Sequence, residues 1–568
     1  MIPRICASAA GRKNSRPGSF RELFHGPSGQ RSGQTGTHKY DMEDRQMFKK
    51  KSRVMLAALA VMMGCKTIPA IAGAAPDGKT PAESTATAAN GAYDAWKEEW
   101  EKNGADWTEV SLTPGADESQ MNFAWYSKDG EAAGFRFGRE KDMADAKDME
   151  VSSVPAQEGY QSNKVALTGL EPDTTYYYQA GDKEIRKFQT RNSDAYSFIF
   201  VGDPQIGSSN SEKAKKPEDI AKDTFKTAQR EAVLSDSFNW NHTLNLAVEK
   251  AGSKPSFVLS AGDQIQTNKK KVKDGTVSEI EYAGYLRPEV LASLPVATTV
   301  GNHDADNENY SWHFNVPNLS TLGSNGIVGG DYSFTYGDAL YLMLNTQDTN
   351  VAEHREFIEN AVAENPDCTW RIVALHQDIY GSAEHSNEPE ITNLRYELVP
   401  IFEDNDVDVV LTGHDHAYSR SYLLKGGVKT VDYDDDSFDE QLEQDIDVGS
   451  SKEQRFVAPA NIKPATADQA GLTYLNYLKA VMDEAAIVSR KSDNLNPDGI
   501  LYLTAGSSSG SKYYDLTPRK QSYIANRWQE DVPTYTIVNV DKQSVTINTY
   551  RTDTNEKIDD QVRIVKIK

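Results

Sequence analysis

Apolar and polar positions follow two patterns along the chain, and the change falls near residue 195. Between residues 107 and 192, short stretches such as Met121–Trp125 alternate apolar and polar side chains and are separated by turn residues. Alternation with a period of two is typical of strands with one buried face, so this region predicts a small all-β sandwich. A turn leads into the tyrosine-rich strand of Leu170–Tyr178, which predicts a tyrosine corner at Tyr176.

After residue 195, continuous apolar runs replace the alternation, and each run ends in a polar cluster. These runs are 197–201, 256–260, 295–300, 371–375 and 407–411. Helix-length segments such as 353–364 and 390–403 lie between them. Apolar strands that alternate with helices indicate an α/β domain with buried sheets. Because loops at the strand ends of such folds hold ligands, we expect the polar clusters to converge.

These patterns divide the chain into four parts. Residues 1–74 form a leader, and 75–106 form a linker with a short helix. Residues 107–192 form the sandwich, and 195–568 form the α/β domain. An insertion is expected at about 430–497, where an acidic run precedes a helix-like stretch over 472–490. We expect the acidic run to be solvated surface, with a calcium site as the weaker alternative.

The leader has the layout of a secretory signal peptide over about residues 47–74. Basic residues at 49–51 and 53 precede the apolar run Val54–Met63, and small residues follow. The run is shorter than the roughly 18 to 20 residues that a membrane span requires. We therefore expect a secreted or cell-surface protein with no transmembrane span after the leader is removed. Lipidation at Cys65 is a minority alternative.

The net charge and the cysteine content exclude some classes of ligand and some kinds of site. Residues 1–74 contain 13 Lys+Arg and 4 Asp+Glu, so of the net charge of −23 the leader contributes +9 and the rest of the chain −32. Such an acidic surface disfavours binding of duplex nucleic acid. Cysteine occurs at Cys6, Cys65 and Cys368. One cysteine remains after the leader is removed, which excludes an intrachain disulfide and a thiolate metal cluster.

The polar clusters at the strand ends supply hard metal ligands. The candidate ligands are Asp203, Gln205, Asp263, Asn302, His376, His414 and His416. Their carboxylate, amide and imidazole donors suit iron, manganese or zinc. A glycine directly precedes four of these residues, which allows the backbone to turn sharply where a strand ends.

The order of these motifs resembles that of the calcineurin-like metallophosphoesterases. The motifs are Gly-Asp-Pro-Gln205, Gly262-Asp263, Gly301-Asn-His-Asp304, Val373-Ala-Leu-His376 and Gly413-His-Asp-His416, and the resemblance covers about residues 196–550. With the preceding sandwich and the sequence His416-Ala-Tyr418-Ser-Arg420, the chain looks most like the purple acid phosphatase branch. The resemblance implies an α/β fold, a metallophosphoesterase two-sheet sandwich flanked by helices, preceded by an all-β fibronectin type III-like sandwich.

The resemblance also implies a role for each residue. Asp203 and His416 match ligands of a first metal ion, Asn302, His376 and His414 match ligands of a second, Asp263 matches the bridging carboxylate, and His303 matches an uncoordinated histidine that protonates the leaving oxygen. Two divalent or trivalent ions held in this way clamp a phosphate ester and generate hydroxide near neutral pH.

Two positions depart from the family pattern. Gln205 stands where the general family has a histidine, and we still expect its amide oxygen to bind a metal ion. Gln266 stands where purple enzymes have a tyrosine, so no iron–tyrosinate colour is expected.

The sequence thus predicts an exported metal-dependent phosphoesterase that hydrolyses small phosphate monoesters by attack of a metal-bound hydroxide. The alternatives are a phosphodiesterase or nucleotide pyrophosphatase on the same site, and a non-catalytic surface adhesion or glycan-binding protein.

Weaker candidates for substrate contact are Tyr418, Arg420, Tyr310 and the loop 506–512. His242, His313, His354 and His385 are expected to be structural.

Overall fold

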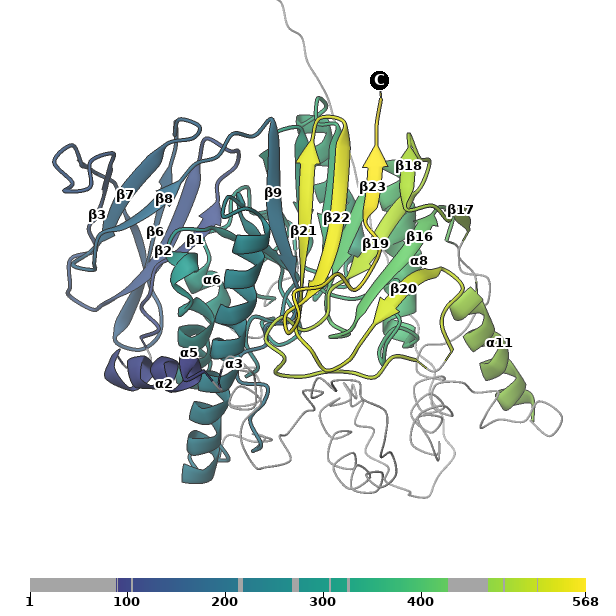
Figure 1. Ribbon diagram of the computed structural model, residues 1–568, viewed down its shortest axis with the longest axis horizontal. Coiled ribbons are helices and arrows are strands. Elements are labelled where there is room, and N and C mark those ends of the chain that lie inside the picture. Colours follow the sequence, from purple (N-terminus) through teal and green to yellow (C-terminus); the bar gives the residue numbers. More distant parts are fainter. Residues whose placement is uncertain are drawn as a thin grey trace, which may run out of the picture. The chain divides into compact units, whose positions relative to one another are not determined.

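The computed structural model describes most of the chain from residue 88 onward (Figure 1). The described residues are 88, 90–103, 106–212, 218–267, 275–305, 308–323, 327–427, 468–483, 486–517 and 519–567. They all belong to one unit, residues 69–568. The expected leader, its signal peptide and Cys65, the linker before residue 88, and the acidic run of the insertion lie outside the described residues.

The N-terminal sandwich consists of two antiparallel sheets. The strands of the first are, in spatial order, β1 (Ser111–Pro114), β2 (Met121–Lys128), β6 (Tyr160–Leu167) and β5 (Ser152–Pro155); those of the second are β4 (Lys147–Asp148), β3 (Phe135–Gly138), β7 (Thr175–Ala180) and β8 (Arg186–Gln189). Their inward side chains, with Phe123 at the centre, form a separate core. Tyr176 Oη accepts the backbone N–H of Glu171 at 2.9 Å, which confirms the expected tyrosine corner.

Two larger sheets form the second domain. One contains β11 (Val296–Thr298), β10 (Val258–Ser260), β9 (Ala195–Val201), β21 (Thr534–Asp541), β22 (Ser544–Arg551), β23 (Val562–Val565) and β18 (Asp493–Leu495), in that order. The other contains β12 (Tyr332–Tyr336), β13 (Ala339–Met343), β14 (Trp370–Ala374), β15 (Val409–Thr412), β19 (Ile500–Thr504), β16 (Tyr418–Leu424) and β17 (Ile487–Ser489), with β20 (Ile524–Trp528) paired to β16. Side chains from both sheets, such as Phe200 and Leu411, share one core.

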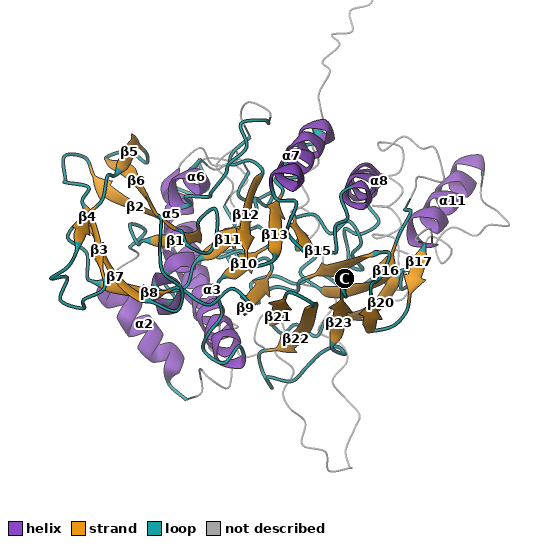
Figure 2. Cartoon of the chain, turned by 90° about the horizontal axis from the view of Figure 1, so that it is seen from above, coloured by secondary structure: helices purple, strands orange, loops and turns teal. Residues whose placement is uncertain are grey.

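Helices cover the outer faces of these two sheets. The helices are α2 (Ala92–Asn103), α3 (Asp223–Lys250), α5 (Gly275–Leu286), η3 (Glu289–Ala292), α6 (Asn309–His313), α7 (Val351–Glu364), α8 (Pro389–Asp404) and α11 (Gln469–Asp483). α3 and α5 pack on the first sheet through a core that includes Ile199, whereas α7 and α8 pack on the second through a core that includes Leu342 (Figure 2). The predicted fold class, an α/β two-sheet sandwich flanked by helices behind an all-β sandwich, is therefore confirmed.

Two helices differ from the sequence-based expectations. α3 was not anticipated, because every position from Ala232 to Phe238 is buried and the segment has no apolar stripe to mark it. The helix expected over 472–490 ends at Asp483, and Ile487–Ser489 is the edge strand β17, paired with β16.

The sandwich is joined to the second domain by buried hydrogen bonds. Tyr126 Oη in β2 donates to Glu279 Oε1 in α5 at 2.8 Å, and Glu279 Oε2 lies 2.5 Å from His313 Nε2 in α6. Asn315 Nδ2 donates to the carbonyl of Val165 in β6 at 3.0 Å. These contacts fix α5 and α6 against the β1–β2–β6 sheet.

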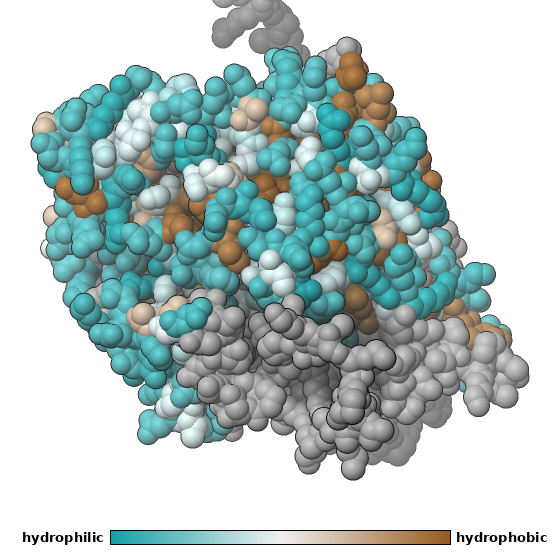
Figure 3. All heavy atoms as spheres, in the orientation of Figure 1, coloured by the Kyte–Doolittle hydropathy of each residue, from teal (hydrophilic) through white to brown (hydrophobic). Residues whose placement is uncertain are grey.

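The face of the protein in Figure 3 is predominantly hydrophilic, with apolar side chains scattered over it. Among the helices of the described residues, none combines the length and the apolar character needed to cross a membrane.

Candidate metal centre

The ends of parallel strands from both sheets meet at one place. β9, β10 and β11 run parallel in one sheet, as do β13, β14, β15 and β19 in the other. The loops that follow them are tied together, because Gln205 N–H donates to the carbonyl of Asp263 at 2.8 Å and Gly413 N–H donates to that of His376 at 3.0 Å. The expected convergence of the polar clusters is thus present in the fold.

Backbone strain is concentrated in these loops. Positive φ angles occur at Asp203 (47°), Gln205 (37°), Asp263 (50°), His414 (71°) and His416 (50°). Non-glycine residues in the left-handed region cost about 1 to 3 kcal/mol each and persist where the surrounding structure enforces them. Five candidate ligands therefore sit on strained turns at the ends of the strands.

His376 is the centre of the first ligand group. Its Nδ1 donates to the carbonyl of Ala261 at 2.8 Å, so Nε2 keeps its lone pair. Nε2 lies 3.0 Å from Asn302 Oδ1, 3.2 Å from His414 Nδ1 and 3.6 Å from Asp263 Oδ1. Four ligand atoms from the loops after β10, β11, β14 and β15 therefore surround one point.

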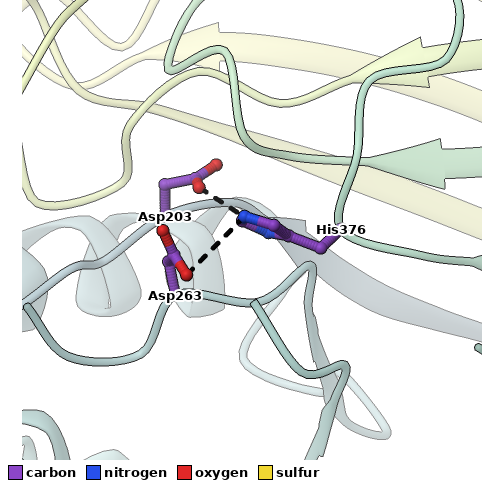
Figure 4. A group of neighbouring side chains, drawn as sticks. All are labelled: Asp203, Asp263 and His376. Carbon is purple, nitrogen blue, oxygen red and sulfur yellow. Dashed lines mark ion pairs between the residues drawn. The ribbon is translucent and has the colours of Figure 1, made fainter. Parts of the chain in front are cut away.

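A second group forms around Asp203. His416 Nδ1 donates to the carbonyl of Lys512 at 2.9 Å, and its Nε2 lies 3.6 Å from Asp203 Oδ1. Figure 4 shows Asp203 and Asp263 one above the other at the same end of the His376 ring; one ligand atom from each of the three lies within 4.8 Å of the others. Asp203 and Asp263 are thus placed to connect the two groups.

Gln205 is fully buried beside these ligands. Neither its amide oxygen nor its amide nitrogen has a hydrogen-bond partner among the residues that the structure describes. Leaving a buried amide unsatisfied costs about 1 to 3 kcal/mol. A buried, unpaired amide oxygen in this position fits a metal ligand.

The electrostatics of the donor set also fit bound cations. Burial, followed by repulsion from Asp263, raises the pKa of Asp203 well above its ordinary value. Burial, followed by nearby histidines, holds the pKa of His414 well below its ordinary value, and burial followed by the Lys512 charge does the same for His416. Neutral imidazoles are the metal-binding form, and a cation relieves the repulsion between the carboxylates.

His303 approaches the site without joining either ligand group. Its backbone N–H donates to Asp263 Oδ1 at 2.9 Å, and its Nδ1 donates to the carbonyl of Gln266 at 2.5 Å. Its Nε2 lies 4.0 Å from Asp263 Oδ2. Asp304 fixes the turn around it by accepting the backbone N–H of Gly301 at 2.9 Å. His303 therefore places its Nε2 beside the carboxylate of Asp263.

Comparison with known families agrees with this geometry. Residues 196–418 match the family described as Calcineurin-like phosphoesterase, and residues 108–199 match the one described as Purple acid Phosphatase, N-terminal domain. The chain contains a calcineurin-like phosphoesterase domain. Members of this family hold a dinuclear metal site, which is consistent with the two ligand groups.

The phosphoesterase domain also has similar sequences and a similar solved structure. An uncharacterized protein of Mycobacterium tuberculosis is 27% identical over 33% of this chain and 38% of its own length. Purple acid phosphatase 23 of Arabidopsis thaliana is 24% identical over 45% of this chain and 57% of its own length, so these alignments span less than two thirds of either relative. Purple acid phosphatase PPD1 of yellow lupin (Lupinus luteus) has the same fold, with a TM-score of 0.54 and 13% identity over 80% of this chain and 74% of that one.

The weaker candidates for substrate contact have structural partners in the phosphoesterase domain. Asp559 Oδ2 accepts hydrogen bonds from Tyr418 Oη at 2.7 Å and from Arg420 Nε at 2.5 Å. Tyr310 Oη lies 2.8 Å from Thr298 Oγ1 at the end of β11. Each of these three side chains thus has a hydrogen-bond partner within the domain, and contact with substrate stays a prediction for them.

His385, for which the sequence predicted a structural role, lies beside the ligand cluster. Its ring centroid lies 4.8 Å from that of His414, and its Nδ1 lies 3.0 Å from Glu388 Oε1. Its Nε2 is buried and has no hydrogen-bond partner within the described part of the chain. His385 was expected to be structural because a histidine outside the ligand motifs is more often a surface or core residue than a ligand. Its position in the same strand-end loop as His376 was the available signal.

Proposed function

We propose that this protein is an exported, metal-dependent phosphatase that hydrolyses small phosphate monoesters. The observation that carries the proposal is the convergence of seven candidate ligands from five strand-end segments, with the Nδ1 groups of His376 and His416 bonded to backbone carbonyls and the Gln205 amide left unpaired among the described residues. The relatives named as purple acid phosphatases support a phosphatase over a non-catalytic binding protein.

The two ligand groups define where metal ions bind. Asp203, Gln205 and His416 hold one ion, Asn302, His376 and His414 hold the other, and Asp263 lies between them. Iron, manganese or zinc, when bound there, polarises the phosphate and lowers the pKa of water so that a nucleophile is available near neutral pH. With Gln266 in place of a tyrosine, we expect a colourless protein.

Two histidines act on the substrate in this proposal. Because Nδ1 of His303 donates to a backbone carbonyl, its Nε2 is the atom that exchanges a proton with the leaving oxygen. The Nε2 of His385, whose ring lies beside that of His414 and which has no hydrogen-bond partner within the described part of the chain, is proposed to bind a phosphate oxygen. Export rests on the sequence pattern of residues 47–74.

The decisive experiment combines metal analysis of the purified protein with hydrolysis of a panel of monoesters, diesters and nucleoside polyphosphates. Two metal equivalents and a preference for monoesters are expected. A preference for diesters or polyphosphates would replace the monoesterase proposal, and a metal-free protein without hydrolysis would refute it.

A further inference from the structure

Glu281 in α5 is buried behind the site and is 1% exposed. Its Oε2 accepts the backbone N–H groups of Gln266 at 3.1 Å and Thr267 at 2.7 Å. Its Oε1 accepts Thr267 Oγ1 at 2.5 Å and Gln229 Nε2 in α3 at 3.1 Å. One carboxyl group thus receives four donors from α3 and from the loop that follows β10.

The same carboxyl group also abuts the loop that follows β9. A Cβ atom at Gly207, whose φ is +97°, would lie 2.7 Å from Glu281 Oε1. Gln266 N–H additionally donates to the carbonyl of Ile206 at 3.0 Å, so the two loops run side by side at this point. Glu281 therefore fills the space where the loops carrying Asp203 and Asp263 leave the metal cluster.

Gln266 connects Glu281 to His303. The peptide group between Gln266 and Thr267 makes this link: its N–H, that of Thr267, donates to Glu281 Oε2 at 2.7 Å, while its C=O, that of Gln266, accepts Nδ1–H of His303 at 2.5 Å. The orientation of a peptide plane is shared by its two neighbouring polar groups, so loss of the donors held by Glu281 frees this segment to turn. Movement of the carbonyl would release the imidazole ring from its single tautomer and direction.

We propose that Glu281 is a positioning residue for proton transfer, which fixes the Gln266 carbonyl and thereby directs Nε2 of His303 at the leaving oxygen. The inference rests on the proposed function, since it concerns the proton donor of that reaction. Burial raises the pKa of Glu281 to about 7, because the charged carboxylate loses its contact with water. The hydrogen bonds that Glu281 accepts act in the opposite direction and offset part of this desolvation cost. General acid catalysis depends on such alignment, because proton transfer needs hydrogen-bond reach to the reacting atom.

Glu281→Gln tests the proposal, since it preserves shape but replaces one acceptor oxygen by an NH₂ group that faces donors. Two metal equivalents should remain. Turnover of alkyl phosphates should fall about 10- to 100-fold, with KM nearly unchanged, whereas nitrophenyl phosphate, whose leaving group needs no proton, should lose far less.

Glu279→Gln is the matched control, because it changes an equally buried carboxyl group on the same helix that contacts Tyr126 and His313 instead. Its ratio of alkyl to nitrophenyl turnover should stay at the wild-type value. Thr267→Val removes one hydrogen-bond donor to Glu281. It should shift the ratio of alkyl to nitrophenyl turnover in the same direction as Glu281→Gln. It is therefore the test variant to use if Glu281→Gln does not fold.

A readout independent of activity is ¹⁵N-histidine NMR of the zinc-loaded protein, with the His303 signals assigned through His303→Gln. Wild type should show the Nδ1–H tautomer, and Glu281→Gln should show a mixture. An unchanged tautomer together with an unchanged substrate ratio in Glu281→Gln would overturn the inference. Absence of hydrolysis by wild type would instead overturn the proposed function, while the tautomer would still decide the role of Glu281.

Discussion

Two buried polar clusters lie on either side of α5, and they differ in how completely their groups are paired. At the contact with the sandwich, Glu279 is matched by Tyr126, Asn309 and His313. At the metal cluster, the buried carboxylates of Asp203 and Asp263 lie within 4.8 Å of each other and of His376, and the Gln205 amide has no partner among the described residues. Protein interiors normally pair their polar groups, so the incomplete cluster is the one built for a ligand.

The backbone shows the same contrast. Glu279, Asn309 and His313 lie in helices, whereas five candidate metal ligands have left-handed φ angles. The cluster around Glu279 thus stabilises the fold, whereas the strained backbone of the metal cluster is held in place by the rest of the fold. Comparing variants of the two clusters separates these roles.

The largest expected effect is that of Asp263→Ala. The variant removes the carboxylate between the two ligand groups, so activity should fall on the order of 10³-fold or more and at least one metal equivalent should be lost. Metal analysis and steady-state kinetics measure both. Full metal content with near-normal turnover would place the bridging role on another residue.

His303→Ala should keep both metal ions but lower turnover of alkyl phosphates by about 10²- to 10⁴-fold. The loss should be much smaller for nitrophenyl phosphate. Equal losses for both substrates would mean that His303 binds the phosphate without donating a proton, and loss of metal would make it a ligand.

Glu279→Ala should act on stability alone. Removing one partner of the buried Glu279–His313 pair should lower the free energy of unfolding by about 3 to 5 kcal/mol, as measured by denaturant titration. Metal content per folded molecule should be unchanged. A loss of metal without destabilisation would show that the two clusters are not separate.

Glu281 should make stability depend on pH. Its pKa rises from the model-compound value of 4.5 to about 7 on folding, so the folded protein binds more protons than the unfolded chain between these values. Stability of wild type relative to Glu281→Gln should therefore fall as pH rises from about 4.5 through 7, by about 3 kcal/mol at most. Thermal melts of both proteins across this window give the difference; a difference independent of pH contradicts the prediction.

Gln205→Leu should have the smallest and most discriminating effect. Replacing an unpaired buried amide by an apolar group should stabilise the metal-free protein by about 1 to 2 kcal/mol. The same change should weaken binding of one metal ion about 10-fold, because a ligand is lost. Melting with and without chelator measures both; equal destabilisation in both states would mean that Gln205 has a structural role.

The order of the two domains and the segments that meet at the site could be predicted from the amino-acid sequence. Period-two alternation before residue 195 and apolar runs after it indicated the sandwich and the α/β domain, because burial of one or both strand faces leaves that pattern in the chain. Parallel strands share their carboxyl edge, so the clusters at Asp203, Asp263 and His376 could be expected to converge.

The hydrogen-bond partner of each polar side chain, by contrast, depends on how the chain packs in three dimensions. Tyr418 and Arg420 follow directly on a ligand motif, yet they pair with Asp559, which is 141 and 139 residues further along the chain. Glu281 and His385 carried no motif, and their positions at the site come from packing of α5 and of the loop after β14. Periodicity records which face of an element is buried, whereas the pairing of polar groups depends on distances between segments remote in sequence, which no local pattern encodes.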